Sequence, residues 1–180
     1  YTFFAALILF STTSCDNDDD VDFEEEEVIT SMLISMTPDD GGDDVLFSFV
    51  DPDGDGGLEP VISVDNLSAN TVYTFNIQLL NETEDPVEDV TEEIEEEDEE
   101  HQFFFEVNGI TADVAYLDFD GNNNPVGLMG TLSTGDAGTG VLTVTLRHEP
   151  SKNAEGVSDG NIANAGGETD IEVAFSLIVE

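Results

Sequence analysis

Short stretches in which apolar and polar residues alternate follow one another from Val28 to the C-terminal end of the chain. They are rich in β-branched and aromatic residues, and Gly, Asn, Asp and Pro separate them. Strands are predicted at 28–37, 45–50, 61–64, 72–80, 103–108, 113–119, 126–133, 139–148 and 170–179. This spacing predicts an all-β fold, an Ig-like antiparallel β-sandwich of about eight or nine strands.

The alternation is clearest in segment 140–147. Leu142, Val144 and Leu146 fall on one face of this strand, and mostly polar residues fall on the other. Successive side chains of a strand point to opposite faces of the sheet. We therefore expect the leucine and valine face to be buried and the opposite face to be wet.

Segment 86–100 breaks the alternation. Val87, Val90 and Ile94 are spaced by three and four residues, and Pro86 suits the first turn of a helix. The pattern predicts one short acidic helix that crosses an end of the sandwich. Its acids repel one another, so the helix must lean on that apolar stripe.

The N-terminal region differs from the rest of the chain. Residues 3–10 are uncharged and apolar but too few to span a bilayer, and Cys15, the one cysteine, is followed by acids. The segment resembles a lipoprotein signal peptide, whose cysteine becomes acylated; the alternative is an ordinary secretory signal with an incidental Cys15. We expect a signal peptide at 1–14, an acidic lipid-anchored tether at 15–27 and a β-sandwich domain at 28–180.

Negative charge dominates the composition. The chain has 43 Asp and Glu against 2 Lys and Arg, a formal net charge of −41. Nucleic-acid binding and docking to anionic headgroups are excluded, because both need clustered Lys and Arg. Self-repulsion opposes the compact state, so salt or divalent cations should stabilise the fold. The alternative source of the excess is a generally acidic proteome in a saline habitat.

Two aspartate-rich loops are candidate calcium sites, because Ca²⁺ prefers oxygen ligands brought together by a glycine turn. In the first loop the candidate ligands are Asp51, Asp53, Asp55, the Gly57 carbonyl and Glu59. In the second loop they are Asp118, Asp120, Asn122 and Asn124. Neither loop completes an EF-hand, since Ile62 stands where the first would need its bidentate Glu. The alternative for both is a solvated turn between strands.

Catalytic patterns are weak. His101 and His148 are the only histidines, each beside an acid, and no nucleophile elbow or zinc-type spacing accompanies them. Structural histidines are the preferred interpretation. Arg147 and Lys152 are expected to be held by neighbouring carboxylates, and the small, polar loop 156–168 is a further candidate contact surface.

Several stretches carry a family resemblance: LNETEDPVEDVTEE at 80–93, DEEHQFF at 98–104, LRHEP at 146–150 and GGETDIEV at 166–173. Together they resemble a family of small Bacteroidetes-type cell-envelope lipoproteins of unknown function, often labelled type 1 periplasmic binding fold superfamily proteins. The resemblance implies no catalytic residues. The label implies alternating β and α elements, whereas the periodicity here predicts layered sheets, and we follow the periodicity.

These observations predict a non-enzymatic, surface-exposed module with a binding, adhesion or envelope-structural role, stabilised by calcium. The alternatives are a ligand-binding lipoprotein of a nutrient uptake system and, third, a hydrolase. The expected location is the bacterial outer membrane, with the chain anchored through acylated Cys15 and facing outward, or alternatively facing the periplasm. Its partner in the envelope or outside the cell is not specified by the sequence.

Overall fold

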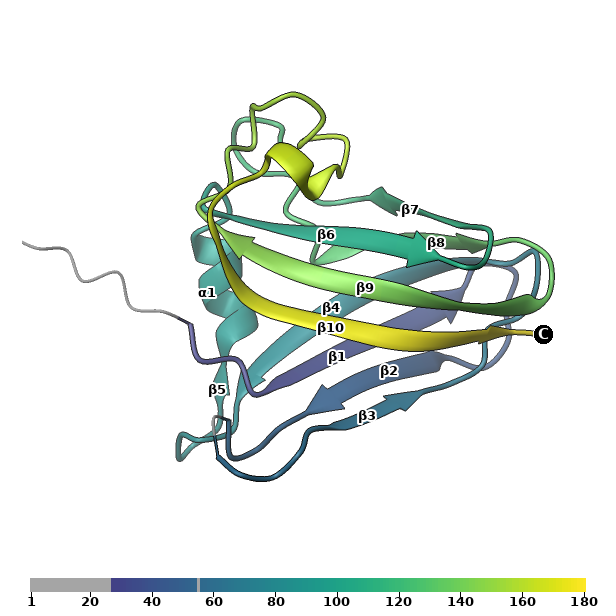
Figure 1. Ribbon diagram of the computed structural model, residues 1–180, viewed down its shortest axis with the longest axis horizontal. Helices are drawn as coiled ribbons and strands as arrows, with labels where there is room; N and C mark the ends of the chain where they lie inside the picture. The colour runs from purple at the N-terminus through teal and green to yellow at the C-terminus, as the bar shows by residue number, and fades with distance from the viewer. Residues whose placement is uncertain (1–26, 55) are drawn as a thin grey trace, which may run out of the picture.

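Two antiparallel sheets lie face to face in the computed structural model, which describes residues 27–54 and 56–180 (Figure 1). The larger sheet has the order β3 (Val61–Val64), β2 (Val45–Val50), β1 (Ser31–Pro38), β4 (Val72–Asn81), β8 (Met129–Thr134), β7 (Ala112–Tyr116), and β5 (Glu88–Asp89) pairs with β4. The smaller sheet has the order β10 (Glu168–Val179), β9 (Gly138–His148), β6 (His101–Asn108). The predicted antiparallel β-sandwich is confirmed, with ten strands.

The core fills the space between the sheets. Leu142, Val144 and Leu146 of β9 are at most 3% exposed, as their alternation predicts. The ring of Phe47 from β2 meets the ring of Phe175 from β10, with their centroids 5.6 Å apart. Inward side chains of both layers therefore interlock, which is how a two-layer sandwich hides its apolar faces from water.

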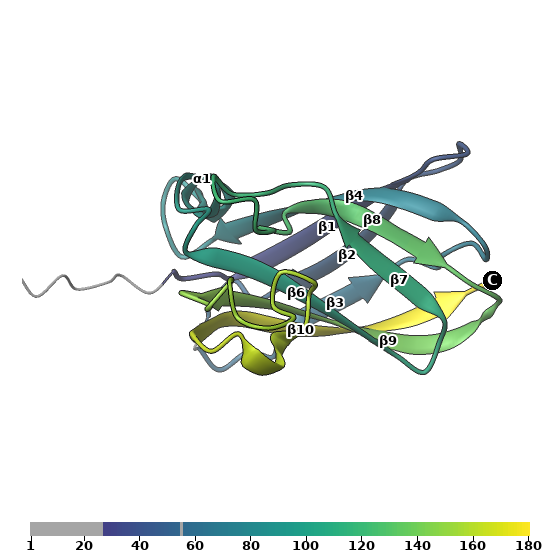
Figure 2. The same ribbon diagram turned by 90° about the horizontal axis from the view of Figure 1, so that it is seen from above.

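The two long edges of the sandwich differ. At one edge Leu67 bridges the layers: its N–H donates to Ile178 and its carbonyl accepts from Glu180, both at 2.9 Å. At the other edge β6 and β7 diverge from their short connection (Figure 2). Backbone hydrogen bonds thus join the two layers along β10, whereas the layers are splayed apart along β6.

Segment 126–128 was expected to begin a strand, but β8 begins only at Met129. The Val126 carbonyl accepts from Phe103 of β6 at 2.7 Å, and the Leu128 carbonyl accepts from Ile77 of β4 at 2.8 Å. These residues join strands of different sheets. They bridge the layers, and for that reason they do not continue the β8 ladder.

The acidic helix is present as α1 (Val90–Glu96), and a single 3-10 turn, η1 (Ile162–Asn164), lies before β10. Asp89 caps α1 by accepting from the Thr91 N–H at 3.1 Å. Val90 and Ile94 are buried, but Val87 is 53% exposed and lies outside the helix, so the apolar stripe is shorter than predicted. Within the described residues, none of the helices has the length and apolarity needed to span a bilayer.

We expect Ile94→Ala to lower the free energy of unfolding by about 2–4 kcal/mol, because Ile94 is fully buried and anchors α1. Val87→Ala is the matched control, and its effect should stay within about 0.5 kcal/mol. Urea unfolding at one fixed salt concentration measures both. Equal losses in the two variants would contradict this account of the helix.

Candidate functional site

Four metal-ligating side chains meet at one end of the sandwich: Glu27, His101, His148 and Asp170. Each offers one ligand atom, and these atoms all lie within 4.8 Å of one another. The residues come from the segment before β1 and from β6, β9 and β10. Only the folded chain brings them together.

Strand pairing and a bulge position three of the four. His101 is the first residue of β6 and pairs directly with His148, the last residue of β9, so their ring centroids lie 4.7 Å apart. The β10 register shifts between Thr169 and Ile171, which leaves Asp170 as an extra residue without a partner position on β9. Bulges redirect side chains in this way and are frequent beside functional sites.

Glu27 bridges the two histidines. Its Oε1 lies 2.8 Å from His101 Nε2, and its Oε2 lies 3.2 Å from His148 Nδ1. Asp170 Oδ1 lies 4.0 Å from the same His148 nitrogen. The four side chains are between 0% and 13% exposed, so the cluster is closed to anything much larger than an ion.

Burial and charge perturb the acid–base behaviour of this cluster. Burial, reinforced by the Glu27 carboxylate, raises the pKa of Asp170 to about 6. Burial would lower the pKa of His101, but the hydrogen bond and charge of Glu27 outweigh it and raise that pKa. Burial would raise the pKa of Glu27, yet His101 lowers it. The cluster therefore attracts positive charge.

Two oxygens of the cluster have no hydrogen-bond partner among the described residues. They are Asp170 Oδ2 and Glu27 Oε2, which lies 3.2 Å from His148 Nδ1 but without hydrogen-bond geometry, and both are buried. Buried carboxylate oxygens are normally satisfied by donors, ordered water or a cation. A polar site with unused acceptors beside two imidazoles has the composition of a transition-metal site.

In the second aspartate-rich loop the two Asp carboxylates accept hydrogen bonds from nearby backbone N–H groups. Asp118 accepts from the N–H groups of Gly127 and Leu128, at 3.0 and 2.8 Å. Asp120 Oδ1 accepts from the N–H groups of Asn122 and Asn124, at 2.9 and 2.8 Å. These bonds are those of a structured turn, and calcium at this loop stays a prediction.

The positive group beside this loop is Lys152. Its ammonium lies 3.1 Å from Asp120 Oδ2 and also donates to the carbonyls of Asp98 and Pro125. Lys152 is 4% exposed, so the expectation that a neighbouring carboxylate holds it is confirmed. Arg147 differs, because its guanidinium donates to the Thr169 hydroxyl.

In the first aspartate-rich loop the Asp53 carboxylate accepts from the N–H groups of Gly57 and Leu58, at 3.0 and 3.3 Å. The Asp51 N–H donates to the Thr30 carbonyl at 2.8 Å, and Glu59 is exposed. Asp55 lies outside the described residues. Calcium at this loop also stays a prediction. Segments 1–14 and 15–26 lie outside the described residues, so the signal peptide, the tether and acylation of Cys15 stay predictions as well.

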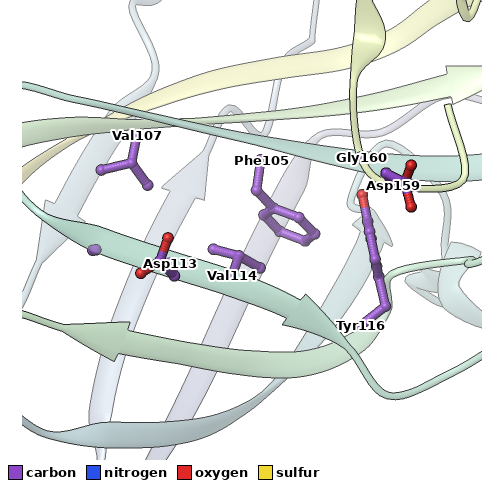
Figure 3. A pocket seen from close by; sticks show the side chains of 8 residues that line it. Phe105, Val107, Asp113, Val114, Tyr116, Asp159 and Gly160 are labelled. Atoms are coloured by element: carbon purple, nitrogen blue, oxygen red, sulfur yellow. The ribbon is translucent and has the colours of Figure 1, made fainter. Parts of the chain in front are cut away.

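A groove of about 210 Å³ opens along the splayed edge between β6 and β7 (Figure 3). Partly exposed Phe105, Val107 and Val114 form its floor. Asp113 on one side and Asp159 on the other are exposed at its rim. Loop 156–168, expected to be a contact surface, thus contributes a wall, and its Val157 is fully buried in a small second core beside Phe104.

Backbone groups along this edge face outward. The Phe103 N–H turns away from β9 to reach Val126, and alternation turns the N–H and C=O groups of Phe105 and Val107 the same way. Across the described part of the chain, no backbone hydrogen bond from another strand reaches these two residues on that side. An edge of this kind is a template for a further strand.

Sequence patterns did not reveal the histidine and carboxylate cluster. Its ligands are separated by tens of residues, whereas zinc-type motifs are recognised by short spacings. The available signal was that each histidine borders a predicted strand, but their meeting depends on the β6–β9 register. No family model, curated protein or solved structure matches this chain, so its function must be argued from these sites.

We expect Asp120→Asn to lower the free energy of unfolding at pH 7 by about 3 kcal/mol, because it leaves the buried Lys152 ammonium without its carboxylate. Burial alone would raise the pKa of Asp120, but the Asn124 N–H, the Lys152 ammonium and the Asn122 N–H lower it. The stabilisation is therefore present above the ordinary value of 3.8 and is lost as the pH falls through the lowered pKa.

Urea unfolding from pH 7 down to acid measures this effect, with the exposed Asp136→Asn as a control of equal charge change. The difference between wild type and Asp120→Asn should shrink only below about pH 4. A difference that is constant with pH, or that equals the control, would contradict an ionic role.

Proposed function

We propose that this protein is a non-enzymatic binding module, lipid-anchored at the bacterial surface, that captures an extended, basic polypeptide segment along its β6–β7 edge. The observation that carries the proposal is the groove between Phe105 and Val114, where an apolar floor adjoins outward-facing backbone groups. Strand addition to an exposed edge uses this combination, with backbone bonds for affinity and side-chain contacts for specificity.

Charge selects the partner. Asp113 and Asp159 stand at the rim of the groove, and the whole chain carries a net charge of −41. A second copy of the chain, or another acidic segment, would be repelled at this edge. A segment that alternates apolar residues with Lys or Arg would place its apolar side chains on the floor and its cations at the rim.

The alternative functions have less support. Pockets for small ligands usually bury most of the ligand's surface, whereas this groove is open along the β6–β7 edge, which suits an extended segment better than a small molecule. The histidine cluster is almost fully buried and does not line the groove, which gives a hydrolytic substrate little access to it. Binding without catalysis is therefore the function that these sites favour.

Binding can be measured with a fluorescent peptide of alternating Lys and Val, by anisotropy at physiological salt. We expect saturable binding, and slower hydrogen exchange of the Phe105 and Val107 amides on addition of the peptide, because these groups would pair with the added strand. The double variant Asp113→Asn with Asp159→Asn should weaken binding about 3- to 10-fold, since rim ion pairs contribute modestly.

The matched control is Glu84→Gln with Glu95→Gln, two exposed acids near α1 that remove the same charge. It should leave the affinity almost unchanged. An equal loss in both double variants, or unchanged exchange at Phe105 and Val107, would show non-specific attraction and defeat the proposal.

Membrane attachment rests on Cys15. We expect the native protein to carry acyl groups on Cys15 and to fractionate with outer membranes, because two or more chains anchor stably. Mass spectrometry of the mature N-terminus and protease accessibility on intact cells measure acylation and orientation. Cys15→Ser should release the protein from the membrane fraction, and an unmodified Cys15 in membrane-bound wild type would contradict the anchor.

A further inference from the structure

We propose that Glu27, His101, His148 and Asp170 form a binding site for a divalent transition-metal ion, with zinc as the best fit. The site goes beyond the binding module proposed above, since the cluster does not line the groove and the ion would not contact a captured peptide.

The spacing of the ligand atoms suits one four-coordinate ion. Zinc bonds of about 2.0–2.1 Å to nitrogen and oxygen place tetrahedral ligand atoms about 3.4 Å from one another. In the cluster His101 Nε2 lies 2.8 Å from Glu27 Oε1, His148 Nδ1 lies 4.0 Å from Asp170 Oδ1, and all four ligand atoms lie within 4.8 Å of one another. Shifts of side chains alone would bring the four atoms onto one ion.

The orientation of His101 leaves a lone pair directed at a carboxylate. Its Nδ1 lies 3.2 Å from the Glu97 carbonyl at the end of α1, and only an N–H can be favourable there. In the neutral ring, Nε2 is then an acceptor facing Glu27 Oε1 at 2.8 Å. Two acceptors this close require a proton or a cation between them.

A carbonyl partner on the far nitrogen is also the usual support for a metal-binding histidine, because it fixes the tautomer and the ring orientation. His148 also directs one nitrogen into the cluster. Its Nδ1 faces Glu27 and Asp170, while its Nε2 lies 3.9 Å from the Glu100 carboxylate. Both rings thus direct one nitrogen inward and the other to an oxygen outside the cluster.

The oxygens supply an independent observation. Asp170 Oδ2 and Glu27 Oε2 are buried without a hydrogen-bond donor, on side chains only 7% and 2% exposed. Protons on the two histidines would leave Asp170 without a donor. A dication bound between the carboxylates would balance both charges and use these lone pairs.

The backbone around Asp170 supports the same assignment. An ordinary β10 strand would alternate inward and outward residues, but the bulge directs Asp170 and the neighbouring buried Ile171 inward in succession. The departure from the ladder delivers one carboxylate to the cluster. A strand that only packs against the core would not require this bulge.

The ligand set also selects among metals. Ca²⁺ and Mg²⁺ prefer six or more oxygens, whereas two imidazoles with two carboxylates favour zinc and similar borderline ions. Four protein ligands with little exposure form a closed site, which is typical of structural zinc. The ion would tie Glu27, where the acidic tether meets the domain, to all three strands of the smaller sheet.

The test uses the full chain, stripped of metal with a chelator and kept in 0.5 M NaCl with millimolar Ca²⁺ and Mg²⁺ to saturate the acidic surface. Zinc is titrated against a chromophoric chelator. We expect one tight equivalent per chain, and X-ray absorption should show two imidazole nitrogens and two oxygens at about 2.0–2.1 Å.

Asp170→Asn and His148→Gln should each weaken zinc binding at least about 100-fold. Asp136→Asn, an exposed acid before the start of β9 and away from the cluster, should leave it unchanged. Zinc bound through oxygens alone, or equal affinity in wild type and Asp170→Asn, would overturn the assignment. The absorption measurement needs no variant, so the test holds even if a substitution impairs folding.

Discussion

Scarcity of positive charge is the constraint on which this structure depends. The chain sets 2 Lys and Arg and two histidines against 43 acids, and the described fold buries Lys152 and His101 and leaves the His148 side chain only 13% exposed. The turn that follows α1 holds them: the Asp98 carbonyl accepts from Lys152, the Glu97 carbonyl contacts His101, and the Glu100 carboxylate lies near His148. The most acidic block of the sequence thus ends beside the buried Lys152 ammonium, which offsets repulsion in the place where it is densest.

The sheets were predictable because strand formation is read from local alternation, which the sequence carries residue by residue. Leu142, Val144 and Leu146 show this, since a period of two decides which face is buried. The sequence locates the two aspartate-rich loops but does not decide whether they bind calcium. A carboxylate that accepts hydrogen bonds from its own loop and a carboxylate that binds calcium have the same spacing in the sequence. The histidine cluster could not be predicted from the sequence. It depends on the pairing of His101 with His148 and on the bulge at Asp170, and both arise only when distant strands pair.

The proposed metal site and the proposed binding edge share strand β6. His101 begins this strand at the cluster, and Phe105 and Val107 lie further along it beside the groove. An edge strand pairs on one side only, so its free side depends on how firmly its ends are held. An ion that fixes the first residue of β6 to β9, β10 and the start of the domain would pre-organise that edge, and pre-organisation lowers the entropic cost of adding a strand.

Protons and a metal ion compete for the same lone pairs, but they differ in how many must bind. Protonation must place one proton between His101 and Glu27, a second on His148 and a third on Asp170 before each buried group has a partner or loses its charge. Satisfying the cluster with protons therefore takes three separate events at three positions. One dication satisfies the four side chains in a single binding event, and in a chain this acidic its arrival also relieves the field around the domain.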